Sequence, residues 1–278
     1  MILARTVLDL PDLQYSKPRA LREALDALSQ PGSCVYAGGT DLLIALSARA
    51  PWAAGVRRLV DIKGVPEARH INDAGGHLRI GALVTAAELA NSDIVRREAP
   101  ALAEAAAATA APALRRRGTV GGNIATPHST GDMTTALLAL DAKVASIEIA
   151  GSTRIDELPL ESVLSSRDGA GSPRLLLSVT IAKQPRSAFA KFPTRLGFGR
   201  SLVCVSMAVA GEQVRVALGG LGERPFHAVE SSLAVEQQTA LADALARECR
   251  PPDDVRVSPA YRLRLAATLI ERLHGKLR

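Results

Sequence analysis

Cysteine is scarce in this sequence and follows no pattern. Among 278 residues there are three cysteines, Cys34, Cys204 and Cys249, an odd number at distant positions. A disulfide framework needs pairs of cysteines, and a metal or iron–sulfur site needs several thiolates close together. The sequence fits neither, so we expect buried structural thiols and no metal bound by this chain.

Long apolar runs and aromatic side chains are also scarce. The chain contains no run of about 18 apolar residues, the length that a transmembrane helix needs. Its first residues carry charges and proline where a secretory signal is continuously apolar. Aromatic residues make up 3% of the chain, a poor supply for the stacking surfaces of single-stranded nucleic-acid binders. We therefore predict a cytoplasmic protein with no membrane span and no nucleic-acid partner.

Catalytic motifs are missing as well. The chain has neither a G-x-S-x-G nor a G-x-x-x-x-G-K-[ST] motif, and no two of its histidines stand at metal-ligand spacing. We predict no catalytic side chain. Any chemistry is then expected to belong to a bound group.

The periodic segments predict a mixture of helices and strands. Helix-like and strand-like segments alternate up to about residue 150, several strands follow, and two helices come last. The expected helices are 18–30, 42–50 (with Thr40 or Asp41 as N-cap), a short one after Thr85, 100–111, 132–140, 235–248 and one beginning after Ser258. The expected strands are 34–37, 58–62, a hairpin over 70–81, 142–149, 175–181, 188–192, 202–209 and 214–218.

One stretch is a candidate linker. RDGAGSPR, residues 167–174, interrupts the periodic segments with glycine, serine and proline. We therefore expect a first domain over residues 1–170 and a C-terminal domain over residues 175–278.

Two glycine pairs are the most unusual local feature. Gly38-Gly39 and Gly121-Gly122 each follow apolar or β-branched residues and precede a polar one, Thr40 or Asn123. Glycines allow consecutive backbone N–H groups to converge on an anion, and a helix starting after Thr40 adds its positive end. Two facing loops of this kind would suit the two phosphates of a pyrophosphate. Taken singly, either pair is better explained by a plain turn, and the first loop lacks the spacing of a Rossmann motif.

Longer stretches around both pairs resemble a known family. "YAGGTDLLIAL" and "RRRGTVGGNIATPHSTGDMTTALLALDAKV" resemble the two FAD loops in the flavin-binding medium subunit of molybdenum hydroxylases, the carbon monoxide dehydrogenase, xanthine dehydrogenase and aldehyde oxidase type. The resemblance continues through "LLLSVTIAKQP", "FAKFPTR", "VALGGLGERP" and "SPAYRLRLAATLIERL", and so covers nearly the whole chain.

The resemblance implies a fold and a cofactor. The implied fold is α+β. It has an FAD-binding domain of the vanillyl-alcohol oxidase and cresol methylhydroxylase type with two α/β lobes, about residues 1–55 and 56–170, followed by a smaller α+β domain with an antiparallel sheet and helices. FAD would lie extended between the lobes. The first loop would wrap its pyrophosphate mainly through backbone N–H groups, with residues Val35, Tyr36, Ala37, Gly38, Gly39, Thr40, Asp41 and Leu42. The second would close on it from the other side, with Thr119, Val120, Gly121, Gly122 and Asn123.

Three further positions are implied by the resemblance. Asp132 would contact the polar chain of the cofactor, and Leu176 and Lys191 would lie near the flavin. Each has a plainer interpretation, because Asp132 suits a helix N-cap, Leu176 a core position and Lys191 a solvated strand. Arg115 to Arg117 suit a solvated loop.

The implied function is electron transfer. In enzymes of this kind a large subunit carries a molybdenum cofactor and a small subunit carries two-iron clusters, typically in a dimer of heterotrimers. The FAD subunit takes electrons from the clusters and passes them to NAD, oxygen or a quinone. Two alternatives stay open. One is a self-sufficient FAD oxidoreductase on a related fold, and the other is a non-enzymatic protein that binds nucleic acid or another anion through Arg115 to Arg117 and the net charge of +6.

Overall fold

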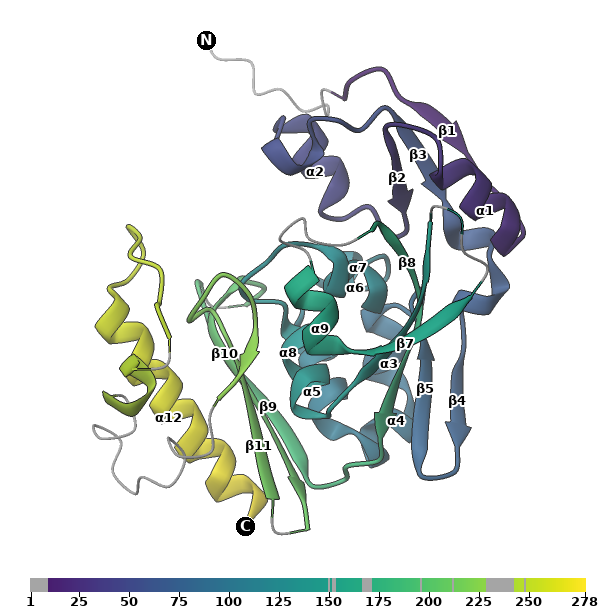
Figure 1. Ribbon diagram of the computed structural model, residues 1–278. Helices are drawn as coiled ribbons and strands as arrows, with labels where there is room; N and C mark the ends of the chain where they lie inside the picture. The colour runs from purple at the N-terminus through teal and green to yellow at the C-terminus, as the bar shows by residue number, and fades with distance from the viewer. Residues whose placement is uncertain are drawn as a thin grey trace.

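Three sheets organise the protein (Figure 1). The computed structural model describes residues 10–149, 151, 154–166, 172–195, 197–211, 213–228, 243–247 and 249–278. Most of the candidate linker at 167–174 and most of the helix expected at 235–248 lie outside the described residues.

The N-terminal sheet is small and parallel, with strand order β1-β3-β2. Adjacent residues of its central strand face opposite sides, since Val60 packs with Ala24 and Leu28 while Leu59 packs with Leu42 and Leu46. Two helices thus cover the two faces of this sheet, at the top of Figure 1. The elements are β1 (Gln14–Ser16), α1 (Leu21–Leu28), β2 (Ser33–Tyr36), α2 (Leu42–Ser47), β3 (Arg58–Asp61) and the 3-10 turns η1 (Pro51–Ala53), η2 (Ile62–Gly64) and η3 (Pro66–Ala68).

A five-stranded antiparallel sheet follows, with order β4-β5-β8-β6-β7. Its strands are β4 (Ile71–Ala74), β5 (His77–Gly81), β6 (Lys143–Glu148), β7 (Ile155–Pro159) and β8 (Arg174–Ala182). The hairpin expected over 70–81 is confirmed as β4–β5. The central strand β8 comes from the stretch after the candidate linker, and where the C-terminal domain begins stays a prediction.

Short helices cover this sheet. They are α3 (Ala86–Asn91), α4 (Asp93–Glu98), α5 (Pro100–Ala108), α6 (Pro112–Arg115), α7 (Val120–Ala125), α8 (Asp132–Ala139) and α9 (Leu160–Ser165). The capping box at Thr85 is confirmed, because its hydroxyl accepts from the Glu88 N–H while the Glu88 carboxylate accepts from the Thr85 N–H.

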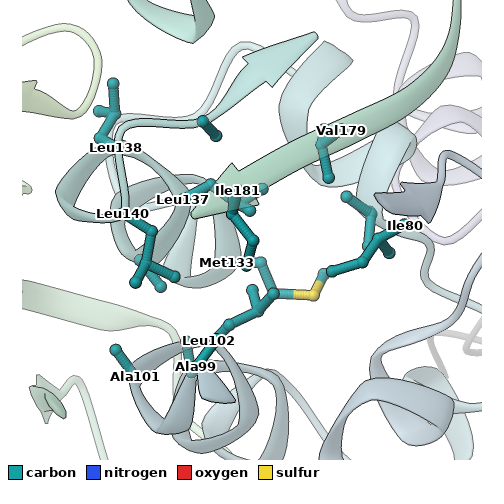
Figure 2. Packing of buried hydrophobic residues seen from close by; sticks show 14 of the residues in the cluster. Ile80, Ala99, Ala101, Leu102, Met133, Leu137, Leu138, Leu140, Val179 and Ile181 are labelled. Atoms are coloured by element: carbon teal, nitrogen blue, oxygen red, sulfur yellow. The ribbon is translucent and has the colours of Figure 1, made fainter. Parts of the chain in front are cut away.

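The main core lies between the sheet and these helices. Every residue of α8 is buried. Figure 2 shows Met133 and Leu137 of α8 near Leu102 of α5 and Ile80 of β5, all members of one buried cluster. A helix buried on all sides carries its polar residues into the interior as well, and this places Asp132 inside the protein.

The C-terminal sheet is antiparallel, with order β12-β11-β10-β9, and α12 packs on β9 and β10 (Figure 1). The elements are β9 (Ser187–Pro193), β10 (Ser201–Ala210), β11 (Gln213–Gly219), β12 (Phe226–His227) and α12 (Pro259–Leu277). Ser258 caps α12 as expected, its hydroxyl accepting from the Tyr261 N–H. Across the described residues, no helix has both the length and the apolar character that a membrane crossing needs.

Candidate cofactor site

A cavity of about 900 Å³ lies where the three sheets meet. Residues of the loop between β2 and α2, of the segment around α7, of the start of α8, and of β8 and β9 all line it. Fourteen of the residues proposed from the sequence are on its wall: Val35, Ala37, Gly38, Gly39, Thr40, Asp41, Leu42, Thr119, Gly121, Gly122, Asn123, Asp132, Leu176 and Lys191. Tyr36 and Val120 are not among the lining residues.

The first loop offers unpaired backbone donors to this cavity. In the part of the chain that the structure describes, the N–H groups of residues 38 to 42 have no hydrogen-bond partner. Gly39 has φ +71°, which side chains other than glycine rarely adopt, and a Cβ there would lie 2.5 Å from the Tyr36 ring. A Cβ on Gly38 would overlap the carbonyl oxygen of Arg117. This loop therefore needs both glycines and leaves its donors free for an anion.

Two cationic side chains that do not line the cavity donate hydrogen bonds to carbonyl groups of this loop. The Lys63 ammonium donates to the Ala37 carbonyl at 3.1 Å, and Arg117 Nε donates to the Gly38 carbonyl at 3.2 Å. Tyr36 stands between them, with Lys63 Nζ 4.1 Å from its ring centroid and Arg117 donating to its hydroxyl at 3.2 Å. Strand alternation places Val35 and Ala37 in the cluster on one face of the N-terminal sheet and Tyr36 in the cluster on the other face.

The second glycine pair has its donors already engaged. It lies in the first turn of α7, where the Gly121 N–H donates to the Ala82 carbonyl at 2.8 Å. The Gly122 N–H donates to the hydroxyl of the N-cap residue Thr119 at 3.0 Å. The flanking N–H groups of Val120 and Asn123 donate to the carbonyls of Val84 and Thr119, each at 2.9 Å. The expectation of converging free N–H groups is wrong for this loop, because helix formation and the contact with Ala82 use them.

Close packing explains the glycine at position 121. A Cβ on Gly121 would lie 2.8 Å from Ala82 Cβ and 3.0 Å from the Ala82 carbonyl oxygen. Gly122 is less confined, since a Cβ there would meet only the Thr119 hydroxyl, at 3.0 Å. Thus Gly121 is required by the approach of one backbone segment to another.

A polar bridge joins the two loops. His128 Nε2 lies 2.9 Å from Asp41 Oδ1, and Arg200 approaches the same oxygen at 3.6 Å. The hydrogen bond with His128 is the main cause that lowers the pKa of the Asp41 carboxyl below its ordinary value. Asp41 occupies the N-cap position of α2, but its side chain makes no capping hydrogen bond. The expected N-cap position of Asp41 is confirmed, but its carboxylate takes part in the bridge and caps no backbone N–H.

Asp132, at the start of α8, and Lys191, in β9, form a buried ion pair on the cavity wall. Lys191 Nζ lies 2.9 Å from Asp132 Oδ2, and the Ser201 hydroxyl donates to Asp132 Oδ1 at 2.6 Å. Burial raises the pKa of the Asp132 carboxyl, and the Lys191 ammonium opposes that rise. Because Lys191 is 10% exposed and Gly131, not Asp132, is the N-cap of α8, neither the solvated-strand nor the N-cap interpretation applies.

Other proposed residues have mixed roles. Leu176 lines the cavity and also packs against the main core, so both of its interpretations hold. Arg115 donates to the carbonyls of Thr109 and Ala110, so it stabilises the loop in which it lies. In the described residues no group of three or more His, Cys, Asp or Glu side chains is placed to hold a metal ion.

Sequence reasoning missed several residues of the cavity. Trp52 and Phe198 line it and are 49% and 55% exposed, and the Arg115 guanidinium lies 6.0 Å from the Phe198 ring centroid. In a chain with one tryptophan and four phenylalanines, an aromatic residue in a polar loop was the available signal. Lys63 and Arg117 carried no local signal, because they act on residues 26 and 79 positions away.

Comparison with protein families decides the relationship. Residues 11–183 match the FAD binding domain in molybdopterin dehydrogenase, and residues 198–277 match the CO dehydrogenase flavoprotein C-terminal domain. The chain belongs to the FAD-binding subunits of molybdenum hydroxylases. This confirms the resemblance, the fold class, the FAD cofactor and the oxidoreductase assignment inferred from the sequence.

Individual relatives agree along the whole chain. The nicotine 6-hydroxylase medium subunit of Paenarthrobacter nicotinovorans is 29% identical over 278 residues, covering 95% of this chain and 96% of the relative. The carbon monoxide dehydrogenase medium chain of Hydrogenophaga pseudoflava is 28% identical over 277 residues, with 94% and 96% covered. A solved carbon monoxide dehydrogenase from the latter organism superposes with a TM-score of 0.80 at 26% identity, covering 96% of this chain and 97% of that chain.

The residues present fit FAD. One wall of the cavity has a row of N–H donors that no described residue pairs, which suits a pyrophosphate, and another has apolar side chains, which suit a flavin ring. The two loops that the family resemblance singled out lie on the same cavity although they are about 80 residues apart in the chain, as the 79-residue separation of Arg117 and Gly38 illustrates.

Proposed function

We propose that this chain is the electron-transfer flavoprotein subunit of a molybdenum-containing hydroxylase or dehydrogenase complex. It takes electrons from iron–sulfur clusters of a small subunit and passes them to an external acceptor, NAD, oxygen or a quinone. A large subunit with the molybdenum cofactor performs the substrate chemistry, in a dimer of heterotrimers. The observation that carries the proposal is the cavity with the donor-lined first loop, in a chain of this family.

The lining residues divide into three groups in this proposal. The first loop holds the pyrophosphate through the N–H groups of residues 38 to 42. The α7 segment contacts it from the opposite side through Thr119, Asn123 and Gly122, which has no side chain. Leu176 and the ion pair of Asp132 with Lys191 form the wall assigned to the flavin. Bound FAD supplies the redox chemistry, and the chain supplies position, a fixed charge and exclusion of water.

A self-sufficient flavoenzyme would need a free acid or base on the cavity wall. The buried carboxylate Asp132 has both oxygens engaged, by Lys191 and Ser201, and His128 is held by Asp41. The anion-binding alternative relies on arginines of which Arg115 and Arg117 are already bonded to backbone carbonyls. These contacts favour the electron-transfer role.

The test is acceptor-linked reoxidation of the assembled complex. We expect the chain, alone or co-expressed with its partner subunits, to purify with one FAD. In the complex, electrons that enter at the molybdenum subunit should reduce the flavin, and one of the three acceptors should reoxidise it. The complex that lacks this chain should not reduce that acceptor. Two results would contradict the proposal. One is a folded chain without flavin in both preparations, and the other is equally fast reduction of the acceptor by the complex that lacks this chain.

A further inference from the structure

Lys63 and Arg117 lie outside the cavity wall, yet they bind carbonyl groups of the loop that lines the cavity. Neither is a lining residue, whereas Ala37, Gly38 and Gly39 all are. Each cation donates to the carbonyl of one of two consecutive peptide groups, at 3.1 Å for Lys63 to Ala37 and 3.2 Å for Arg117 to Gly38. The contacts are therefore made from the side of the loop that faces away from the ligand.

Because the peptide group is planar, holding its carbonyl also fixes the direction of its N–H group. In a trans peptide, the C=O of one residue and the N–H of the next point in opposite directions in one plane. Fixing the carbonyls of Ala37 and Gly38 behind the loop thus turns the N–H groups of Gly38 and Gly39 towards the cavity. Both N–H groups lack a partner in the described part of the chain.

Charge adds to the effect of orientation. A carbonyl that accepts from a cation makes the N–H of the same peptide group a stronger donor, because the hydrogen bonds polarise one another. The cations are themselves held in place: Lys63 pairs with Asp61 at 2.8 Å, and Arg117 and Lys63 contact the same Tyr36 ring from its hydroxyl and its face. Tyr36 is the spacer between them and supports Gly39, whose missing Cβ leaves room for its ring.

We propose that Lys63 and Arg117 are positioning residues for the pyrophosphate of FAD, acting through the peptide groups 37–38 and 38–39. Tyr36 belongs to the same device and acts from behind the loop without touching the ligand. This inference rests on the proposed function, since it presumes that the first loop binds the diphosphate. It predicts that removing either charge weakens recognition of the phosphates and leaves the flavin ring site unchanged.

The experiment compares two ligands that differ in the diphosphate. Dissociation constants for FAD and for riboflavin, which has no phosphate, are measured by flavin fluorescence for wild type, Lys63→Met, Arg117→Met and the double variant. The preparation is the one, chain alone or complex, in which the wild type holds FAD. Lys183→Met is the matched control, because it loses one positive charge that pairs with Asp73 at 2.8 Å and does not line the cavity.

We expect each single variant to weaken FAD binding about tenfold, the cost of losing one charged hydrogen bond. The double variant should weaken it further, and riboflavin affinity should change less than about twofold. Lys63→Arg should retain FAD affinity close to wild type, which excludes misfolding as the cause, and Lys183→Met should bind both ligands normally.

Two results overturn the inference alone. One is normal FAD affinity in both Met variants, and the other is a parallel loss of FAD and riboflavin, which indicates a structural role only. A wild-type protein that takes up no FAD in either preparation overturns the proposed function, and the inference with it.

Discussion

Gly38-Gly39 and Gly121-Gly122 look alike in the sequence, and the structure uses them in opposite ways. At the first pair, Arg117 donates to the Gly38 carbonyl and Lys63 donates to the carbonyl of the preceding residue, Ala37. The N–H groups of Gly38 and Gly39 are unpaired in the described chain. In the second pair the N–H groups are bonded, to Ala82 and Thr119. Both pairs border the same cavity.

The difference teaches what a glycine pair does and does not indicate. Glycine marks a place where a Cβ cannot be accommodated, and the obstacle differs between the loops. At Gly39 it is the backbone conformation and a supporting ring; at Gly121 it is the neighbouring backbone of Ala82. Only the first arrangement creates donors for an anion. The direction of the hydrogen bonds, rather than the motif, separates a binding loop from a packing contact.

The buried ion pair of Asp132 and Lys191 gives the largest expected loss of stability, and it contrasts with both loops. Lys191→Met leaves the buried Asp132 carboxylate without its cation, and we expect a loss of about 3–5 kcal/mol in the free energy of unfolding. Asp132→Asn in the same background should recover part of the loss, because it removes the buried charge. Urea unfolding measures both. Lys183→Met, at a more exposed pair, should cost less than about 1 kcal/mol. Equal losses at the two lysines would contradict a buried pair.

Gly39→Ala breaks the binding side of the comparison. Its Cβ would displace the Tyr36 ring 2.5 Å away, so we expect FAD affinity to fall by about two orders of magnitude, or about 2.7 kcal/mol. Gly75→Ala is a matched control, since Gly75 has the same φ of +71° but open space around its Cβ position. Both variants carry a backbone cost of about 1–2 kcal/mol in stability. FAD titration and urea unfolding separate the effects; equal FAD affinity in the two variants would be the contrary result.

Gly121→Ala breaks the packing side. The added methyl must push against Ala82, and we expect a stability loss of about 1–3 kcal/mol in the flavin-free protein. Gly122→Ala should cost less, because its Cβ meets a single hydroxyl and alanine favours a helix more than glycine does. Ala82→Gly should partly rescue Gly121→Ala, since it removes the closer of the two contacts. No rescue, together with unchanged stability of Gly121→Ala, would refute the packing role.

The bridge between the loops gives the smallest effect, and it depends on pH. The hydrogen bond with His128 lowers the pKa of Asp41 in the folded state, so its contribution is present above the ordinary value of about 4 and is lost as pH falls through the lower, folded value. We expect acid to cost the wild type up to about 1 kcal/mol more than it costs Asp41→Asn, a modest figure because the pair is partly exposed. Thermal unfolding of both proteins between about pH 3 and 6 measures it. Parallel curves for the two proteins would show that the bridge adds nothing to the stability of the fold.

Local chemistry made much of the fold predictable. The β4–β5 hairpin follows from Asp73 to Gly76, the capping box from Thr85 and Glu88, and the start of α12 from Ser258 and Pro259. Each is decided by residues within a few positions of one another. The orientation of Tyr36 was within reach too, because alternation along β2 places it opposite Val35 and Ala37.

The division of labour between the loops depends on distant partners. Ala82 lies 39 positions before Gly121, and Arg117 lies 79 positions after Gly38, so no local pattern records that these backbones meet. The burial of Asp132 depends likewise on α8 being covered on every side and on Lys191 and Ser201 of a different sheet. Non-local packing decided which donors were left free, and the sequence carried no sign of it.

Amide hydrogen exchange with and without FAD tests the central claim most directly. The account predicts that the amides of residues 38 to 42 exchange rapidly in the flavin-free protein and become protected when FAD binds. The amides of Val120 to Asn123 should be protected in both states, because their donors are already bonded. Protection gained equally in both loops on FAD binding would contradict the account, as would a first loop that is protected before FAD is added.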